Sequence, residues 1–88
     1  MNIMEFYDAF GNKVKANIIL FFEFKINKKN YLVYTLSHDE IIFEEDKNKV
    51  YIEEAKKIDG KNYLHQITDA REWNLLKEYF YKFTAKLI

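Results

Sequence analysis

The chain has 88 residues, of which 49% are hydrophobic and 18% aromatic, so we expect one small packed domain spanning residues 1–88. Lysine and arginine together number 14, as do aspartate and glutamate, and this neutrality argues against nucleic acid or an anionic membrane as a partner. There is no cysteine, no signal-peptide pattern and no apolar stretch near the ~18 residues of a membrane span, which predicts a cytoplasmic protein without disulfides.

The N-terminal half of the chain predicts three β-strands. Residues 3–7 form a short apolar run that ends in a glycine-containing turn, and residues 14–26 then alternate between two faces with a period of two. A two-residue turn at positions 27–28 would follow and would set Phe24 opposite Tyr31 on the next strand. These signals predict a β-hairpin preceded by one more strand.

The C-terminal half predicts two further strands and a helix. Residues 49–58 and 63–67 are predicted as strands joined by a tight turn. From Asp69 the apolar spacing changes to three and four residues, which is typical of an amphipathic helix, and Asp69 with Glu72 forms a possible capping box at its start. The helix is expected to run from about Asp69 to Leu87, and its apolar stripe consists of Trp73, Leu76, Phe80, Phe83 and Leu87.

These elements predict an α+β fold, a five-stranded antiparallel β-meander with one C-terminal amphipathic helix packed on one face. We place the helix on the face that carries the even-numbered residues of the second strand. The opposite face is then a candidate apolar interaction surface for a second copy or another protein, formed by Ile19, Phe21, Leu32, Tyr34 and Leu36. The alternative is that the acidic loop folds back and covers this face with residues 41–43.

The sequence predicts no catalytic, cofactor-binding or metal-binding residues. The segment 38–46 gathers one histidine and several carboxylates, but its spacing lacks the alternating acidic positions and central glycine of a calcium loop. No glycine-rich phosphate loop is present, because the chain has two glycines and each is predicted to lie in a turn. We therefore expect a protein that is not an enzyme and has no cofactor or small-molecule substrate.

Two functional classes remain. A non-catalytic protein-interaction or regulatory module would use the apolar sheet face for self-association or for an unknown protein partner. The alternative is a nucleic-acid-binding domain in which bases stack on Phe21, Tyr34 and Tyr51, with lysines 13, 15 and 25 nearby. The neutral charge, the single arginine and the excess of four acidic groups over residues 38–59 argue against it.

The order of these signals resembles the YrzB-like family of small bacterial proteins, a domain of unknown function. The resemblance is carried by "GNKV", by the "FEF" of residues 22–24, by "NYLVY", and by "LHQITDAREW" ahead of the helix. It implies a bacterial source, to which the abundance of lysine, asparagine, isoleucine and tyrosine and the lack of proline also point. It implies no catalytic residue. This chain departs from the family in its balanced charge, and in having Leu36 and Gln66 around places where members often have proline.

Overall fold

The computed structural model describes residues 2–37, 44–46 and 49–87, with helical side chains as far as residue 82. The described elements follow the predicted order: β1 (Ile3–Tyr7), β2 (Lys13–Phe24), β3 (Lys29–Leu36), the short 3-10 helix η2 (Glu44–Asp46), β4 (Tyr51–Ile58), β5 (Lys61–His65) and α1 (Ala70–Leu87). The α+β class, the antiparallel meander and the C-terminal helix are confirmed.

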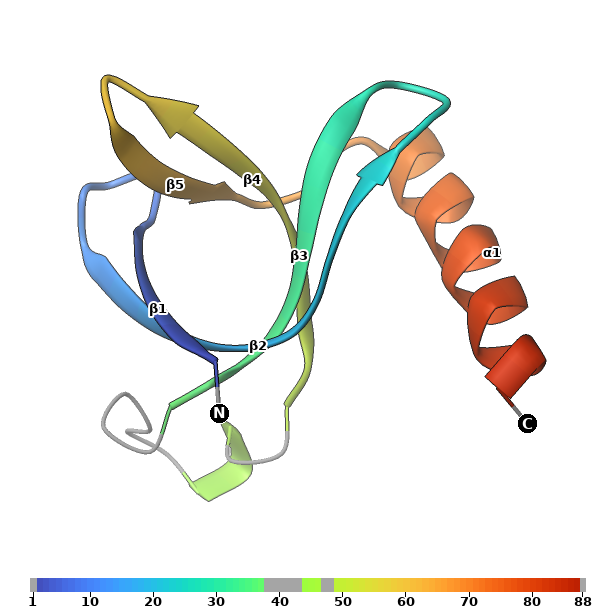
Figure 1. Cartoon of the computed structure of the whole chain (residues 1–88), viewed down its shortest axis with the longest axis horizontal. Helices are drawn as coiled ribbons and strands as arrows, with labels where there is room; N and C mark the ends of the chain where they lie inside the picture. Colours follow the sequence, from blue (N-terminus) through green and yellow to red (C-terminus); the bar gives the residue numbers. More distant parts are fainter. Residues whose placement is uncertain (1, 38–43, 47–48, 88) are drawn as a thin grey trace.

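The meander curls into a closed barrel with the strand order β1-β2-β3-β4-β5 (Figure 1). Consecutive strands of an odd-numbered meander alternate in direction, so β1 and β5 run the same way and can close the barrel only as a parallel pair. The structure closes it with one such pairing, Tyr7 opposite Tyr63. The face opposite the helix, which carries the predicted interaction surface, therefore encloses the barrel interior.

The β2–β3 hairpin has a longer turn than the sequence suggested. Residues 25–28 form a four-residue turn, in which the N–H of Lys28 donates to the carbonyl oxygen of Phe24 at 2.7 Å. Lys28 adopts the left-handed conformation with a φ of 59°, which closes the turn without a glycine. Phe22 rather than Phe24 consequently lies opposite Tyr31, so the predicted register is wrong.

A β-bulge in β2 moves its side chains from one face to the other. The pairing with β3 shifts between Ile18 and Leu20, so one extra residue enters β2 at this point. Because side chains alternate with a period of two, a one-residue shift exchanges the two faces. Phe22 and Phe24 thus pack outside the barrel, whereas Ala16 and Ile18 pack inside. The even-numbered face meets the helix only beyond the bulge.

Two hydrophobic clusters result, one on each side of the β2–β3 pair. The buried members of the inner cluster fill the barrel and are Phe6, Ala16, Leu32, Tyr34 and Leu64. The buried members of the outer cluster are Phe24, Tyr31 and Leu76, with Phe22, Ile67 and Trp73 packed against them. The helix therefore covers the outside of the barrel next to β2 and β3, as Figure 1 shows.

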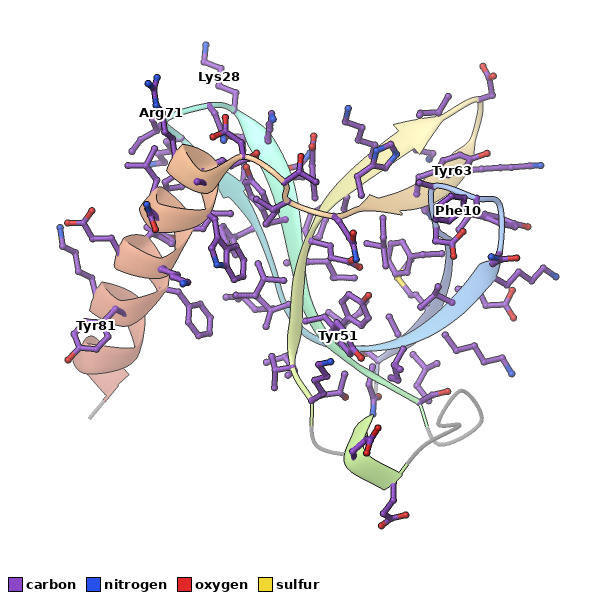
Figure 2. The ribbon with its side chains drawn as sticks, turned by 180° about the vertical axis from the view of Figure 1, so that it is seen from behind. Phe10, Lys28, Tyr51, Tyr63, Arg71 and Tyr81 are labelled. Carbon is purple, nitrogen blue, oxygen red and sulfur yellow. The ribbon has the colours of Figure 1, made fainter. Side chains whose placement is uncertain are left out.

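The helix begins at its predicted cap and packs through its first half. Asp69 accepts a hydrogen bond from the backbone N–H of Arg71 at 2.8 Å, which is an N-cap. Leu76 is buried and Trp73 is half-buried, as the apolar stripe predicted, whereas Tyr81 projects away from the barrel (Figure 2). The side chains of the stripe residues 83 and 87 lie outside the described ones.

Candidate functional site

The five residues predicted to form one exposed apolar surface are distributed over three environments. Ile19 and Phe21 are each 57% exposed, whereas Leu32 is fully buried, Tyr34 is 4% exposed and Leu36 is half-buried. Leu32, Tyr34 and Leu36 belong to the inner cluster, because curling of the sheet turns their face into the barrel interior. The predicted exposure of these three residues is therefore wrong.

The barrel covers this face with its own strands. Phe6 of β1, Tyr51 and Ala55 of β4 and Leu64 of β5 pack in the inner cluster with the residues of β2 and β3. The alternative cover, residues 41–43, lies outside the described part of the chain. Ile19 is the residue inserted at the bulge; it has no partner on β3 and does not belong to the inner cluster.

Phe21 and Leu32 lie directly opposite each other and form one wall of a hollow at an end of the barrel. We call this hollow the apolar mouth; its volume is about 380 Å³. Phe21 and Met4 are exposed at its edge, while Phe6 and Leu32 are buried beneath them. The remaining lining residues are Ile18, Asn30, Ala55, Lys56, Lys57 and Asn62.

The charged residues that line the apolar mouth are both lysines. Lys56 and Lys57 lie near the end of β4, next to the two-residue loop Asp59-Gly60 that joins β4 to β5. Asp59 and Gly60 have φ angles of 50° and 80°, the positive values that a tight hairpin loop of this kind requires. This loop holds the β4–β5 hairpin in a fixed twist beside the mouth, with both ammonium groups exposed at the surface.

A second group of polar residues joins the helix to the barrel. The Tyr31 hydroxyl donates a hydrogen bond to the Glu72 carboxylate and accepts one from the Asn27 side-chain amide at 2.8 Å. The Lys29 ammonium lies 3.3 Å from the same carboxylate, and the two form an ion pair. Glu72 therefore anchors α1 to the hairpin, and this contact replaces the predicted return of its side chain to the helix cap.

Burial and a carboxylate partner act on two tyrosines in the same direction. Burial raises the pKa of Tyr31, and its hydrogen bond to Glu72 raises it further. Burial likewise raises the pKa of Tyr34, whose hydroxyl donates to the Glu53 carboxylate inside the barrel. Both hydroxyl groups therefore stay protonated at neutral pH, which suits structural hydrogen bonding rather than nucleophilic or basic catalysis.

The structure does not place the three aromatic rings of the predicted nucleic-acid platform on one exposed surface. Phe21 lies at the apolar mouth, whereas Tyr34 is buried and stacks against Tyr51 with ring centroids 5.3 Å apart. A nucleic-acid base could not reach the Tyr34 ring in this arrangement. Residues 38–43 of the acidic segment lie outside the described residues, and among those described no three His, Asp or Glu side chains gather as a metal site.

Sequence reasoning found Phe21 but missed Met4, Lys56 and Lys57. Met4 and Phe6 are two residues apart in β1, and this spacing indicates a shared face. No local pattern, however, shows that this face meets the end of β4. The mouth forms only because the barrel brings five strands together.

Within the part of the chain that the structure describes, no helix is long and apolar enough to cross a membrane. No curated protein and no solved structure matches the chain. Residues 11–85, from the β1–β2 turn into α1, match the family described as protein of unknown function (DUF1292). With most of its length matched, the chain belongs to this family of unknown function.

Proposed function

We propose that this chain is a non-catalytic protein-interaction module of the YrzB-like type, acting in the bacterial cytoplasm. Its partner is another protein, which inserts an apolar side chain into the apolar mouth and places acidic residues beside Lys56 and Lys57. The observation that carries this proposal is the hollow of about 380 Å³ at the end of the barrel, with Phe21 exposed at its edge over the buried Leu32.

The energetics of the mouth favour an apolar anchor. Burying one leucine- or phenylalanine-sized side chain contributes roughly 1.5–3 kcal/mol, and the partner also covers the exposed parts of Phe21 and Met4. Such a central apolar anchor surrounded by polar residues is the usual arrangement of a binding hot spot. The barrel lining is already packed, so little conformational entropy is lost on binding.

The charges at the mouth select the flanking residues of the partner. Lys56 and Lys57 are the charged groups in the lining, and both are exposed, so they influence association rate and specificity more than affinity. A segment with one large apolar residue between aspartates or glutamates complements this arrangement. The non-catalytic role is supported by the apolar lining of the mouth, in which the charged groups are the two lysines.

The test is a selection from a random displayed peptide library on the immobilised protein, with the Phe21→Glu variant used to remove peptides that bind elsewhere. We expect the enriched peptides to carry a large apolar residue flanked by acidic ones. Their affinity should fall at least about tenfold for Phe21→Glu and should weaken with added salt.

The matched control is Ile26→Glu, which adds the same charge at another exposed apolar residue, in the β2–β3 turn. This variant should bind the selected peptides like the wild type. Equal binding to Phe21→Glu and wild type would contradict the proposal. Light scattering that shows a dimer lost in Phe21→Glu would also contradict it, because a second copy would then be the occupant.

A further inference from the structure

The end of the barrel away from the apolar mouth contains a second hollow, with a volume of about 520 Å³. On β4 it is lined by Tyr51 and Glu53, whereas the mouth is lined by Ala55 and the two lysines. On β3, Leu32 lines the mouth, whereas Tyr34 lines the second hollow. The two hollows share no lining residue, so the second is a separate feature.

The chemistry of this second hollow is aromatic and acidic. Tyr34 and Tyr51 stack with ring centroids 5.3 Å apart and an angle of 19° between the rings. Figure 2 shows Tyr51 on the barrel side of β4. The carboxylates in the lining belong to Asp8 and Glu53, and no lysine or arginine of the described chain lines the hollow. Its other lining residues are Ala9, Phe10, Val14, Leu36, Leu64, His65, Gln66 and Thr68.

The two carboxylates differ in what they already bind. Asp8 Oδ1 accepts hydrogen bonds from the backbone N–H groups of Phe10 and Asn12 at 2.9 and 2.8 Å, so Asp8 is used in building the β1–β2 turn. Glu53 accepts a hydrogen bond from the Tyr34 hydroxyl, and no ammonium or guanidinium group of the described residues lies within ion-pair distance of it. Glu53 is therefore the lining carboxylate that no cation of the described residues neutralises.

Glu53 is half-buried and lines the hollow, so a cation that enters it meets a carboxylate that no ammonium group of the described residues pairs with. Aromatic rings beside it add attraction for a cation through their negative faces. In this chain the Lys49 ammonium already occupies the Tyr51 ring, with its Nζ 5.6 Å from the centroid, and Tyr34 stacks on the same ring, so Tyr51 contributes apolar contact area to the hollow. The hollow therefore combines a carboxylate with aromatic and aliphatic contact area, which suits the ammonium group and the methylene stem of an alkylammonium ion.

We infer that this hollow binds a lysine side chain of a partner protein, with its ammonium group on Glu53 and its methylene stem against Tyr51 and the apolar side chains of the lining. The Phe10 side chain, 90% exposed on a turn whose backbone is held by Asp8, gives the partner an aromatic contact at the rim. This inference does not depend on occupancy of the apolar mouth.

The test is an NMR titration of the whole chain with n-butylammonium chloride, the closest small mimic of a lysine side chain, at constant ionic strength. We expect amide signals of Tyr51, Glu53 and neighbouring lining residues to shift in a saturable manner. The neutral analogue n-butanol should produce much smaller shifts. Equal shifts for both compounds, or ammonium-dependent shifts confined to other parts of the chain, would overturn the inference.

Two variants locate the charge that binds. Glu53→Gln keeps the size of the side chain and an acceptor for Tyr34, and should weaken n-butylammonium binding by about tenfold. The control Glu54→Gln removes the same charge one residue away, from a side chain that pairs with Lys29 and Lys56 instead. It should leave binding unchanged. An equal loss in both variants, or no loss in either, would contradict a site on Glu53.

The source of the ammonium group is tested with a blocked glycine-lysine-glycine peptide and with putrescine, a free diamine. The peptide should bind at least as tightly as n-butylammonium, because its backbone can also meet the exposed rim. Tighter binding of putrescine than of the peptide would overturn the assignment to a protein lysine.

Discussion

The two faces of the β2–β3 hairpin are each completed by a tyrosine that donates its hydroxyl to a glutamate. On the outer face the Tyr31–Glu72 pair lies beside Lys29, whose ammonium is 3.3 Å from the carboxylate. On the inner face the Tyr34–Glu53 pair has no such cation among the described residues. The tyrosine–glutamate pair thus has an ammonium partner at the helix joint and none among the described residues inside the barrel, which is why we assign a structural role to one and propose a binding role for the other.

The largest expected effect is a loss of stability when a residue of the inner cluster is truncated, in contrast to a residue of the bulge. Leu32→Ala should destabilise the protein by ~2–5 kcal/mol, because Leu32 is fully buried and its loss leaves a cavity. That is a large share of the roughly 4–13 kcal/mol expected for a chain of this length. Urea unfolding followed by circular dichroism measures the change. The control Ile19→Ala, at the exposed bulge residue, should change stability by less than about 0.5 kcal/mol.

The next prediction tests whether the outer cluster can unfold while the barrel stays folded. Leu76→Ala should weaken the packing of α1 by ~2–4 kcal/mol while the inner cluster remains intact. Trp73 packs in the outer cluster and is the single tryptophan, so its fluorescence reports on this region alone. We expect a red-shifted emission at low urea in Leu76→Ala but not in Leu75→Ala, whose side chain is exposed. Coincident loss of fluorescence and strand signal would show one indivisible core.

A smaller effect sharpens the comparison of the two carboxylates. Glu72→Gln should reduce stability by about 1 kcal/mol, because it weakens the hydrogen bond from Tyr31 and removes the charge that pairs with Lys29. Glu53→Gln should change stability by less than about 0.5 kcal/mol, because the weaker hydrogen bond from Tyr34 is offset by loss of a charge that no cation of the described residues pairs with. Both changes are measured by urea unfolding at neutral pH. Equal destabilisation by the two substitutions would remove the distinction between the faces.

The last prediction, with the smallest expected effect, concerns alkaline pH, where the raised pKa values of two tyrosines make stability depend on pH. The pKa values of Tyr31 and Tyr34 are raised in the folded state above their ordinary value of 10.0, so folding favours the protonated hydroxyl groups. Their contribution to stability is fully present below about pH 10 and is lost as pH rises above it. The urea midpoint should therefore fall between about pH 9 and about pH 11. Tyr31→Phe and Tyr34→Phe should each reduce this fall, whereas Tyr81→Phe, at an exposed residue, should not.

The fold was predictable where its signals are local. Alternation in β2, the three-and-four spacing of Trp73 and Leu76 and the cap at Asp69 each depend on residues a few positions apart, and each was found. The predicted hairpin register was wrong because the turn takes four residues, 25–28, so that Phe24 pairs with Lys29 instead of Tyr31. The bulge was not predicted, because a residue inserted inside an apolar run causes no change in composition.

The candidate site was predictable only in part, since Phe21 was identified but its setting was not. By itself the sequence determined which residues are apolar, which segments form strands and a helix, and that the β2–β3 pair has apolar groups on both faces. Tertiary structure alone decided that one of those faces closes on itself, through the pairing of Tyr7 with Tyr63. That pairing joins strands from opposite ends of the meander, and a periodicity measured along the chain contains no information about which distant strands meet.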